Sequence, residues 1–116
     1  MKAELLIPLL VAMVGCAPAN VGEACDRIMR AQCEHAGRCL SFTATEVRDC
    51  ISVGVRTCCA DQGVCGRPLV DPEATGRCVT ATADQDCFDW KAWAAGPRTT
   101  APPVARACVG AAAVGN

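Results

Sequence analysis

The sequence has few aromatic residues and almost no histidine. Among its 116 residues there is no tyrosine, and there are only two phenylalanines, two tryptophans and one histidine, His35. A core made of alanine, valine, isoleucine and leucine is weak in so small a domain, because a short chain buries little apolar area per residue. We therefore expect covalent cross-links to supply much of the stability.

An excess of charge of one sign is also missing. The formal net charge is −1, and the arginines are scattered singly along the chain. Proteins that bind nucleic acid carry a basic patch that neutralises phosphates, and no such cluster occurs here. We expect no nucleic-acid partner.

The motifs of metal and redox chemistry are absent as well. There is no C-x-x-C pair, and His35 follows Cys33 by two residues on one expected helix, whereas structural zinc sites use closely spaced ligand pairs. We expect His35 to be solvated near the helix end, and Asp84, Asp86 and Asp89 to form a solvated helix start. The sequence therefore predicts no catalytic residue, no metal ligand and no cofactor, and a small metal-binding or redox protein is the weakest alternative.

What the sequence does contain is cysteine, at eleven positions. A short chain this rich in cysteine is typical of a disulfide scaffold from an oxidising compartment. We therefore expect an exported protein.

Residues 1–15 have the three parts of an export signal. Lys2 is followed by an apolar run from Leu5 to Val14 and then by small residues. The apolar run is too short to span a bilayer as a helix. Residues 1–15 are therefore predicted to be a signal peptide.

Two processing sites compete at the end of this segment. Met13-Val14-Gly15-Cys16 resembles a bacterial lipobox, in which the cysteine is lipid-modified and begins the mature chain. Ala17-Pro18-Ala19 fits an A-x-A site, where cleavage would remove residues 1–19 and release a soluble chain starting at Asn20. The small Gly15 beside Cys16, at the end of the apolar run, favours lipidation of Cys16. On either route ten cysteines remain, which is the even number that five disulfides require.

Two cysteine pairs share one spacing. Cys25 and Cys33 are eight positions apart, and so are Cys50 and Cys58. Eight residues make a little over two helical turns, so each pair lies on one helix face. Two helices joined by a short loop pack antiparallel, which pairs the inner and the outer cysteines. The spacing therefore predicts the disulfides Cys33–Cys50 and Cys25–Cys58.

Cap signals bound this predicted hairpin, residues 20–63. The first helix begins at Asn20 and ends near Gly37; the second begins at a Thr43 capping box and stops at Gly63. In the antiparallel register Met29 faces Gly54. A large residue opposite a glycine lets the two helices approach to disulfide distance.

The second half predicts two or three further short helices. One opens at residues 71–73, one runs from Asp84 or Asp86 to 96–97, and residues 104–114 form the last. We expect Cys59 to tie the hairpin to this half. Six cysteines are left for three bridges in an order that the spacing leaves open: Cys39, Cys59, Cys65, Cys78, Cys87 and Cys108. The expected fold is one all-α, disulfide-rich domain, residues 20–113.

Trp90 and Trp93 are three residues apart on the expected fourth helix. In a domain short of large apolar residues such a pair is mostly core, so we expect Trp90 inside. Trp93 is the candidate surface for a partner.

Two resemblances accompany these patterns. The paired cysteines resemble the disulfide-stapled hairpins of twin cysteine-pair proteins, although the spacing differs from the mitochondrial form. The leader, the helical cysteine pair, the Cys58-Cys59 doublet and the late segment Pro103–Cys108 together resemble small cysteine-rich lipoproteins of myxobacteria. That resemblance implies a cell-envelope location and no particular activity.

The sequence thus predicts an exported cell-envelope lipoprotein without catalytic activity, acting as a structural or interaction module. Its expected partners are a membrane, reached through the lipid on Cys16, and another envelope protein. The residue after Cys16 is Ala17 and not the aspartate typical of an inner-membrane retention signal, so in a Gram-negative organism the outer membrane is favoured over a periplasmic or secreted location. A soluble secreted factor, such as an inhibitor or toxin, is the alternative.

Overall fold

The computed structural model describes residues 16–97 and 99–115. The predicted signal peptide, residues 1–15, lies outside the described residues. The described part is helical, as the sequence predicts, and its helices are joined by five disulfides. They are α2 (Val21–Leu40), α3 (Ala44–Val55), α4 (Ala74–Asp84) and α5 (Phe88–Ala95), with a π-helical turn, η1 (Arg56–Ala60), and a 3-10 turn, η2 (Arg106–Cys108).

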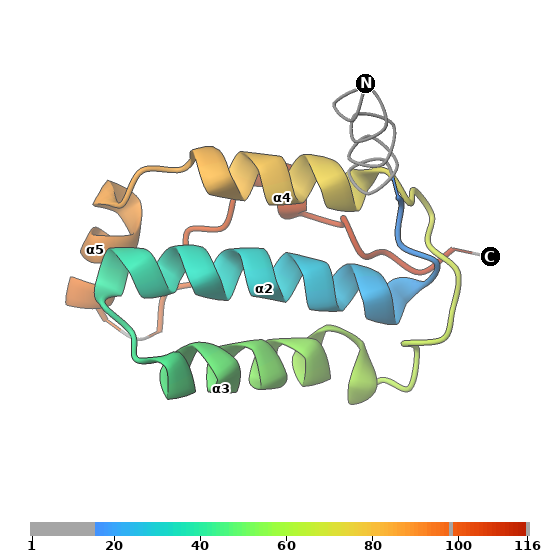
Figure 1. The fold of residues 1–116 in the computed structure, drawn as a ribbon, viewed down its shortest axis with the longest axis horizontal. Helices are drawn as coiled ribbons and strands as arrows, with labels where there is room; N and C mark the ends of the chain where they lie inside the picture. The colour runs from blue at the N-terminus through green and yellow to red at the C-terminus, as the bar shows by residue number, and fades with distance from the viewer. Residues whose placement is uncertain (1–15, 98, 116) are drawn as a thin grey trace, which may run out of the picture.

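Helix α2 is the centre of the arrangement. Helices α3 and α4 lie along opposite sides of it, and α5 lies across its C-terminal end (Figure 1). Half of the 20 residues of α2 are buried, whereas no residue of α3 is. Helix α3 is therefore an outer helix, which packs on α2 with one face and exposes the other.

The two helices of the hairpin begin where the sequence predicts. The Asn20 side chain accepts a hydrogen bond from the Glu23 amide at 2.9 Å. Thr43 and Glu46 form the predicted capping box, with bonds of 2.9 and 3.1 Å. Each cap satisfies amide groups that have no partner inside the helix.

The predicted end of the first helix at Gly37 is wrong. Helix α2 continues to Leu40 and ends on Ser41, which has a left-handed backbone (φ 59°). Gly37 is buried where the hairpin turns back, and a Cβ there would lie 2.8 Å from Cγ2 of Val47. The glycine permits close approach of the second helix and does not end the first. The second helical segment, α3 continued by η1, ends at Ala60, three residues before the predicted stop at Gly63. Gly63 lies in the turn that follows and has a left-handed backbone (φ 68°).

The structure contains both predicted hairpin disulfides, Cys25–Cys58 and Cys33–Cys50, with Cα–Cα distances of 5.9 and 5.8 Å. Met29 packs against Gly54, as the antiparallel register requires: a Cβ at Gly54 would lie 2.9 Å from Cγ of Met29. The hairpin register is therefore confirmed.

The other six cysteines form Cys39–Cys87, Cys59–Cys65 and Cys78–Cys108. Cys59 pairs only six residues ahead, in the loop that follows it, so it closes a local loop. The link from the hairpin to the later helices, which we expected of Cys59, is made by Cys39. A domain with five disulfides is typical of an oxidising environment.

The helices of the second half start later than predicted or are shorter. Helix α4 begins at Ala74, and the Asp71 side chain holds the turn before it by accepting from the Glu73 amide at 3.1 Å. Helix α5 ends at Ala95, and Gly96 is its C-cap, which agrees with the predicted end at residues 96–97.

The predicted last helix, residues 104–114, is wrong. Only Arg106–Cys108 forms a 3-10 turn, and Gly110 has a left-handed backbone (φ 73°) that interrupts a helix. The backbone after it pairs instead with the loop before α4: the Val70 amide donates to the Ala113 carbonyl at 3.0 Å, and the Gly115 amide donates to the Pro68 carbonyl at 2.7 Å. These bonds replace the ones a helix would make.

Candidate functional site

An apolar groove lies where α2, α3 and α5 meet the C-terminal segment. It has a volume of about 270 Å³. None of its lining residues in the described part carries a charge. The side chains that define the apolar groove include Met29, Phe42, Val53, Trp90, Trp93 and Val104. A concave apolar surface of this kind suits an uncharged ligand group or an apolar side chain.

Two tryptophans form one wall of the apolar groove. Trp90 is 5% exposed, and its ring meets that of Trp93 edge to face, with centroids 5.9 Å apart. The indole N–H of Trp90 donates to the Gln85 side chain at 3.3 Å, and that of Trp93 donates to the Thr100 carbonyl at 3.0 Å. Trp90 is thus core, as predicted. Trp93 is partly buried and lines the apolar groove.

His35 is not at a solvated helix end. It is 6% exposed, and α2 continues five residues beyond it. Its Nε2 lies 3.7 Å from Sγ of Cys39, and its ring meets Trp90 edge to face at 6.5 Å. The prediction of a solvated cap was wrong because the helix is longer than Gly37 suggested. His35 packs behind the Cys39–Cys87 disulfide.

The described residues offer no metal site. No three histidine, cysteine or acidic side chains within residues 16–97 and 99–115 come close enough to share an ion. The acidic run Asp84, Asp86 and Asp89 is exposed. Asp86 accepts a hydrogen bond from the Phe88 amide at 2.9 Å, so it holds the turn that leads into α5.

Cys16 lies at the start of the described chain and is exposed; it belongs to none of the five disulfides. Its carbonyl accepts a hydrogen bond from Nη1 of Arg27 at 2.7 Å. Pro18 is buried, and the Ala19 amide donates to the Glu23 carboxylate. Residues 16–20 are therefore packed onto the domain. Within the described ranges, no helix has the length and apolar character needed to cross a membrane.

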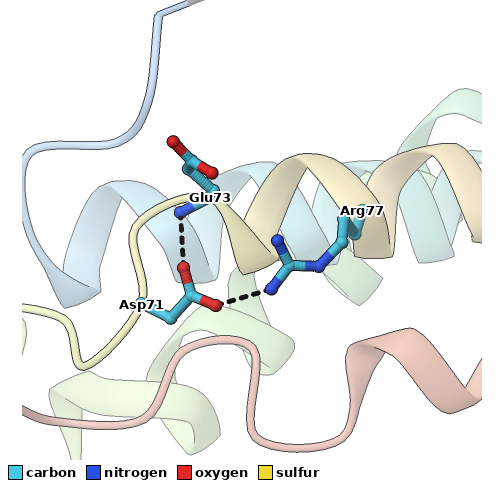
Figure 2. A network of polar contacts seen from close by, with 3 residues as sticks. All are labelled: Asp71, Glu73 and Arg77. Carbon is cyan, nitrogen blue, oxygen red and sulfur yellow. Dashed lines mark hydrogen bonds and ion pairs between the residues drawn. The ribbon is translucent and has the colours of Figure 1, made fainter.

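A polar network fixes the loop before α4 (Figure 2). One carboxylate oxygen of Asp71 accepts from the Glu73 amide at 3.1 Å, and the other pairs with Nη2 of Arg77 at 2.5 Å. The hydrogen bond from the Arg77 guanidinium, together with that from the Glu73 amide, holds the pKa of Asp71 below its ordinary value.

Because the pKa of Asp71 is lowered in the folded state, the stability of the fold should depend on pH. A carboxyl group with a depressed folded-state pKa stabilises the fold above its unfolded pKa, about 3.9, and loses that contribution as the pH falls through the folded value. We expect Arg77→Gln to raise the pKa of Asp71 in an NMR titration of the side-chain carboxyl carbon. Arg48→Gln, on α3, is the control and should leave the pKa of Asp71 unchanged. If the pKa of Asp71 were the same in the Arg77→Gln variant and in the native chain, Arg77 would not be the cause of the lowered value.

The sequence identified Cys16 and Trp93 but not the groove beside Trp93. Phe42, Val53 and Val104 come from three separate segments, and no spacing in the sequence relates them. Comparison with known proteins adds no relative: no protein-family model, curated protein or solved structure matches this chain.

Proposed function

We propose that this chain is an exported cell-envelope lipoprotein, anchored in the outer membrane through an acylated Cys16. Its disulfide-rich domain acts as a structural or interaction module that holds another envelope protein at the apolar groove. The main observation in support of the proposal is that Cys16 is set apart from the other ten cysteines. All ten from Cys25 to Cys108 pair with one another, and Cys16 alone is exposed outside that framework.

The packing of residues 16–20 supports the anchor over the soluble alternative. Cleavage after Ala19 would discard the Cys16 carbonyl that Arg27 binds, together with the buried Pro18. It would also cut the chain directly before Asn20, the cap of α2. A segment removed during export has no physical reason to pack in this way.

Mass spectrometry of the mature protein tests the anchor. The full chain is produced in a Gram-negative bacterium and purified with detergent. We expect an N-terminal peptide that begins at an acylated Cys16, and a Cys16→Ser variant that carries no lipid and leaves the membrane fraction. A free Asn20 terminus in the native chain would refute the anchor and establish the soluble alternative.

In-cell crosslinking tests the interaction. A photoreactive residue placed at Val53, on the groove wall, should crosslink to one envelope protein. Truncating a central aromatic contact of an interface typically costs 2 kcal/mol or more, so we expect Trp93→Ala to reduce the crosslink at least about tenfold. Phe88→Ala is the matched control, because Phe88 is on the same helix, 75% exposed and outside the groove. An undiminished crosslink with Trp93→Ala would show that the groove is not the contact.

A further inference from the structure

A second concave site lies directly beside Cys16. It is a cavity of about 570 Å³ between the start of α2 and the first turns of α4. We call it the anchor cavity. Besides Cys16, the residues that define it are Pro18, Arg27, Thr75, Gly76 and Val79.

Thr75, one of the residues that line the anchor cavity, has a buried hydroxyl without a hydrogen-bond partner among the described residues. Thr75 is 1% exposed, and in the described part of the chain its hydroxyl makes no hydrogen bond. Thr82, equally buried on the same helix, donates to the Cys78 carbonyl at 2.8 Å. A buried hydroxyl without a partner is destabilising, so buried hydroxyls in folded proteins are nearly always bonded. Thr75 therefore indicates an acceptor that residues 16–97 and 99–115 do not supply.

The chain holds Cys16 at this cavity. The bond from Arg27 to the Cys16 carbonyl, the buried Pro18 and the bond from the Ala19 amide to Glu23 leave the segment little freedom. A group attached to Cys16 therefore starts at the cavity mouth, where its effective concentration is high.

The lining indicates an uncharged occupant. Arg27 and Glu73 both line the anchor cavity, so their charges balance, and an anion would meet a carboxylate. Pro18, Pro72 and Val79 supply apolar surface. An acyl group has the matching chemistry, because its carbonyl oxygen accepts a hydrogen bond and its methylene groups are apolar.

We infer that the anchor cavity receives the first part of the acyl group on Cys16, with the Thr75 hydroxyl donating to its carbonyl. The domain is then held directly against the membrane in one orientation, with the start of α4 toward the lipid. This inference rests on the acylation proposed above.

The test uses the full chain, processed in a bacterium, labelled with ¹³C in its methyl groups and kept in deuterated detergent micelles. Mass spectrometry first establishes whether Cys16 is acylated. NMR then measures contacts between the protonated acyl chain and the methyl groups of Thr75 and Val79. We expect these contacts in the native chain and none in Cys16→Ser.

Filling the anchor cavity should expel the acyl group. A Cβ at Gly76 meets no atom within 4 Å, so Gly76→Leu has room for its side chain and is expected to fold. We expect Gly76→Leu to keep its acyl group and lose the contacts, and Ala83→Leu, on the same helix and outside the cavity, to keep both. If the native chain is acylated but its acyl group makes no contact with Thr75 and Val79, this inference is wrong and the proposed acylation of Cys16 is retained. A chain without acyl at Cys16 overturns both.

Discussion

Replacing Cys39 and Cys87 by serine is expected to lower the free energy of unfolding by about 4 kcal/mol. The disulfide spans 48 residues, the longest loop of the five, and chain entropy makes the stabilisation grow with loop length. Helix α5 has only eight residues and packs on α2, and a helix that short is not stable alone. Without the disulfide, α5 should leave the end of α2.

Chemical denaturation with tryptophan fluorescence checks this prediction. Trp90 is 5% exposed in the native fold, so its release should shift the emission to longer wavelength before the rest of the domain unfolds. The control is Cys59→Ser with Cys65→Ser, whose disulfide spans six residues and should contribute about 2 kcal/mol. Equal losses from the two pairs, or unchanged emission on removing Cys39–Cys87, would contradict the role given to this bridge.

The hairpin disulfides could be predicted and the other three could not, for a physical reason. Cys25, Cys33, Cys50 and Cys58 sit on two adjacent helices joined by a short loop, so helical geometry alone determines which faces meet. Cys39–Cys87 depends on where α5 docks, across 48 residues of chain. Local spacing contains no information about that contact.

The errors in the sequence interpretation come from tertiary contacts at small residues. Gly37 resembles a helix stop, but it is the point where Val47 of α3 approaches the α2 backbone. Extending α2 past Gly37 then buries His35, which had been expected in solvent. Residues 104–114 have helical composition, yet their backbone bonds to the loop at residues 68–70. In each case a long-range contact overrides local propensity.

The two candidate sites differ in how far their residues lie apart in the sequence. Cys16 could be identified because its signal is local: an apolar run, a small residue and a cysteine outside an even set. The anchor cavity could not, because the whole hairpin separates Cys16 from Thr75 in the sequence, and the two residues line one cavity only after α4 docks on α2. A buried threonine without a partner is visible only in three dimensions.

Gly54→Val is expected to destabilise the domain by about 3 kcal/mol, at the upper end of the usual cost of overpacking. A Cβ at position 54 would lie 2.9 Å from Cγ and 3.3 Å from Cβ of Met29, so the clash includes the root of that side chain. The helices cannot separate to relieve it, because disulfides cross the hairpin on both sides of Gly54: Cys33–Cys50 on one side and Cys25–Cys58 on the other.

A double-mutant cycle measured by urea denaturation distinguishes a clash with Met29 from a change in helix propensity at position 54. Gly76→Val makes the same change in α4 at a site where a Cβ meets nothing within 4 Å, so it should cost less than about 0.5 kcal/mol. Met29→Ala removes Cγ and Sδ, the two atoms of Met29 nearest to a Cβ at position 54, and leaves only the Cβ contact at 3.3 Å. Adding it to Gly54→Val should therefore recover about 1–2 kcal/mol relative to the sum of the two single changes. Additive effects of Gly54→Val and Met29→Ala would show that the glycine is not required for close approach of α2 and α3, and the physical reason given for the hairpin register would then be wrong.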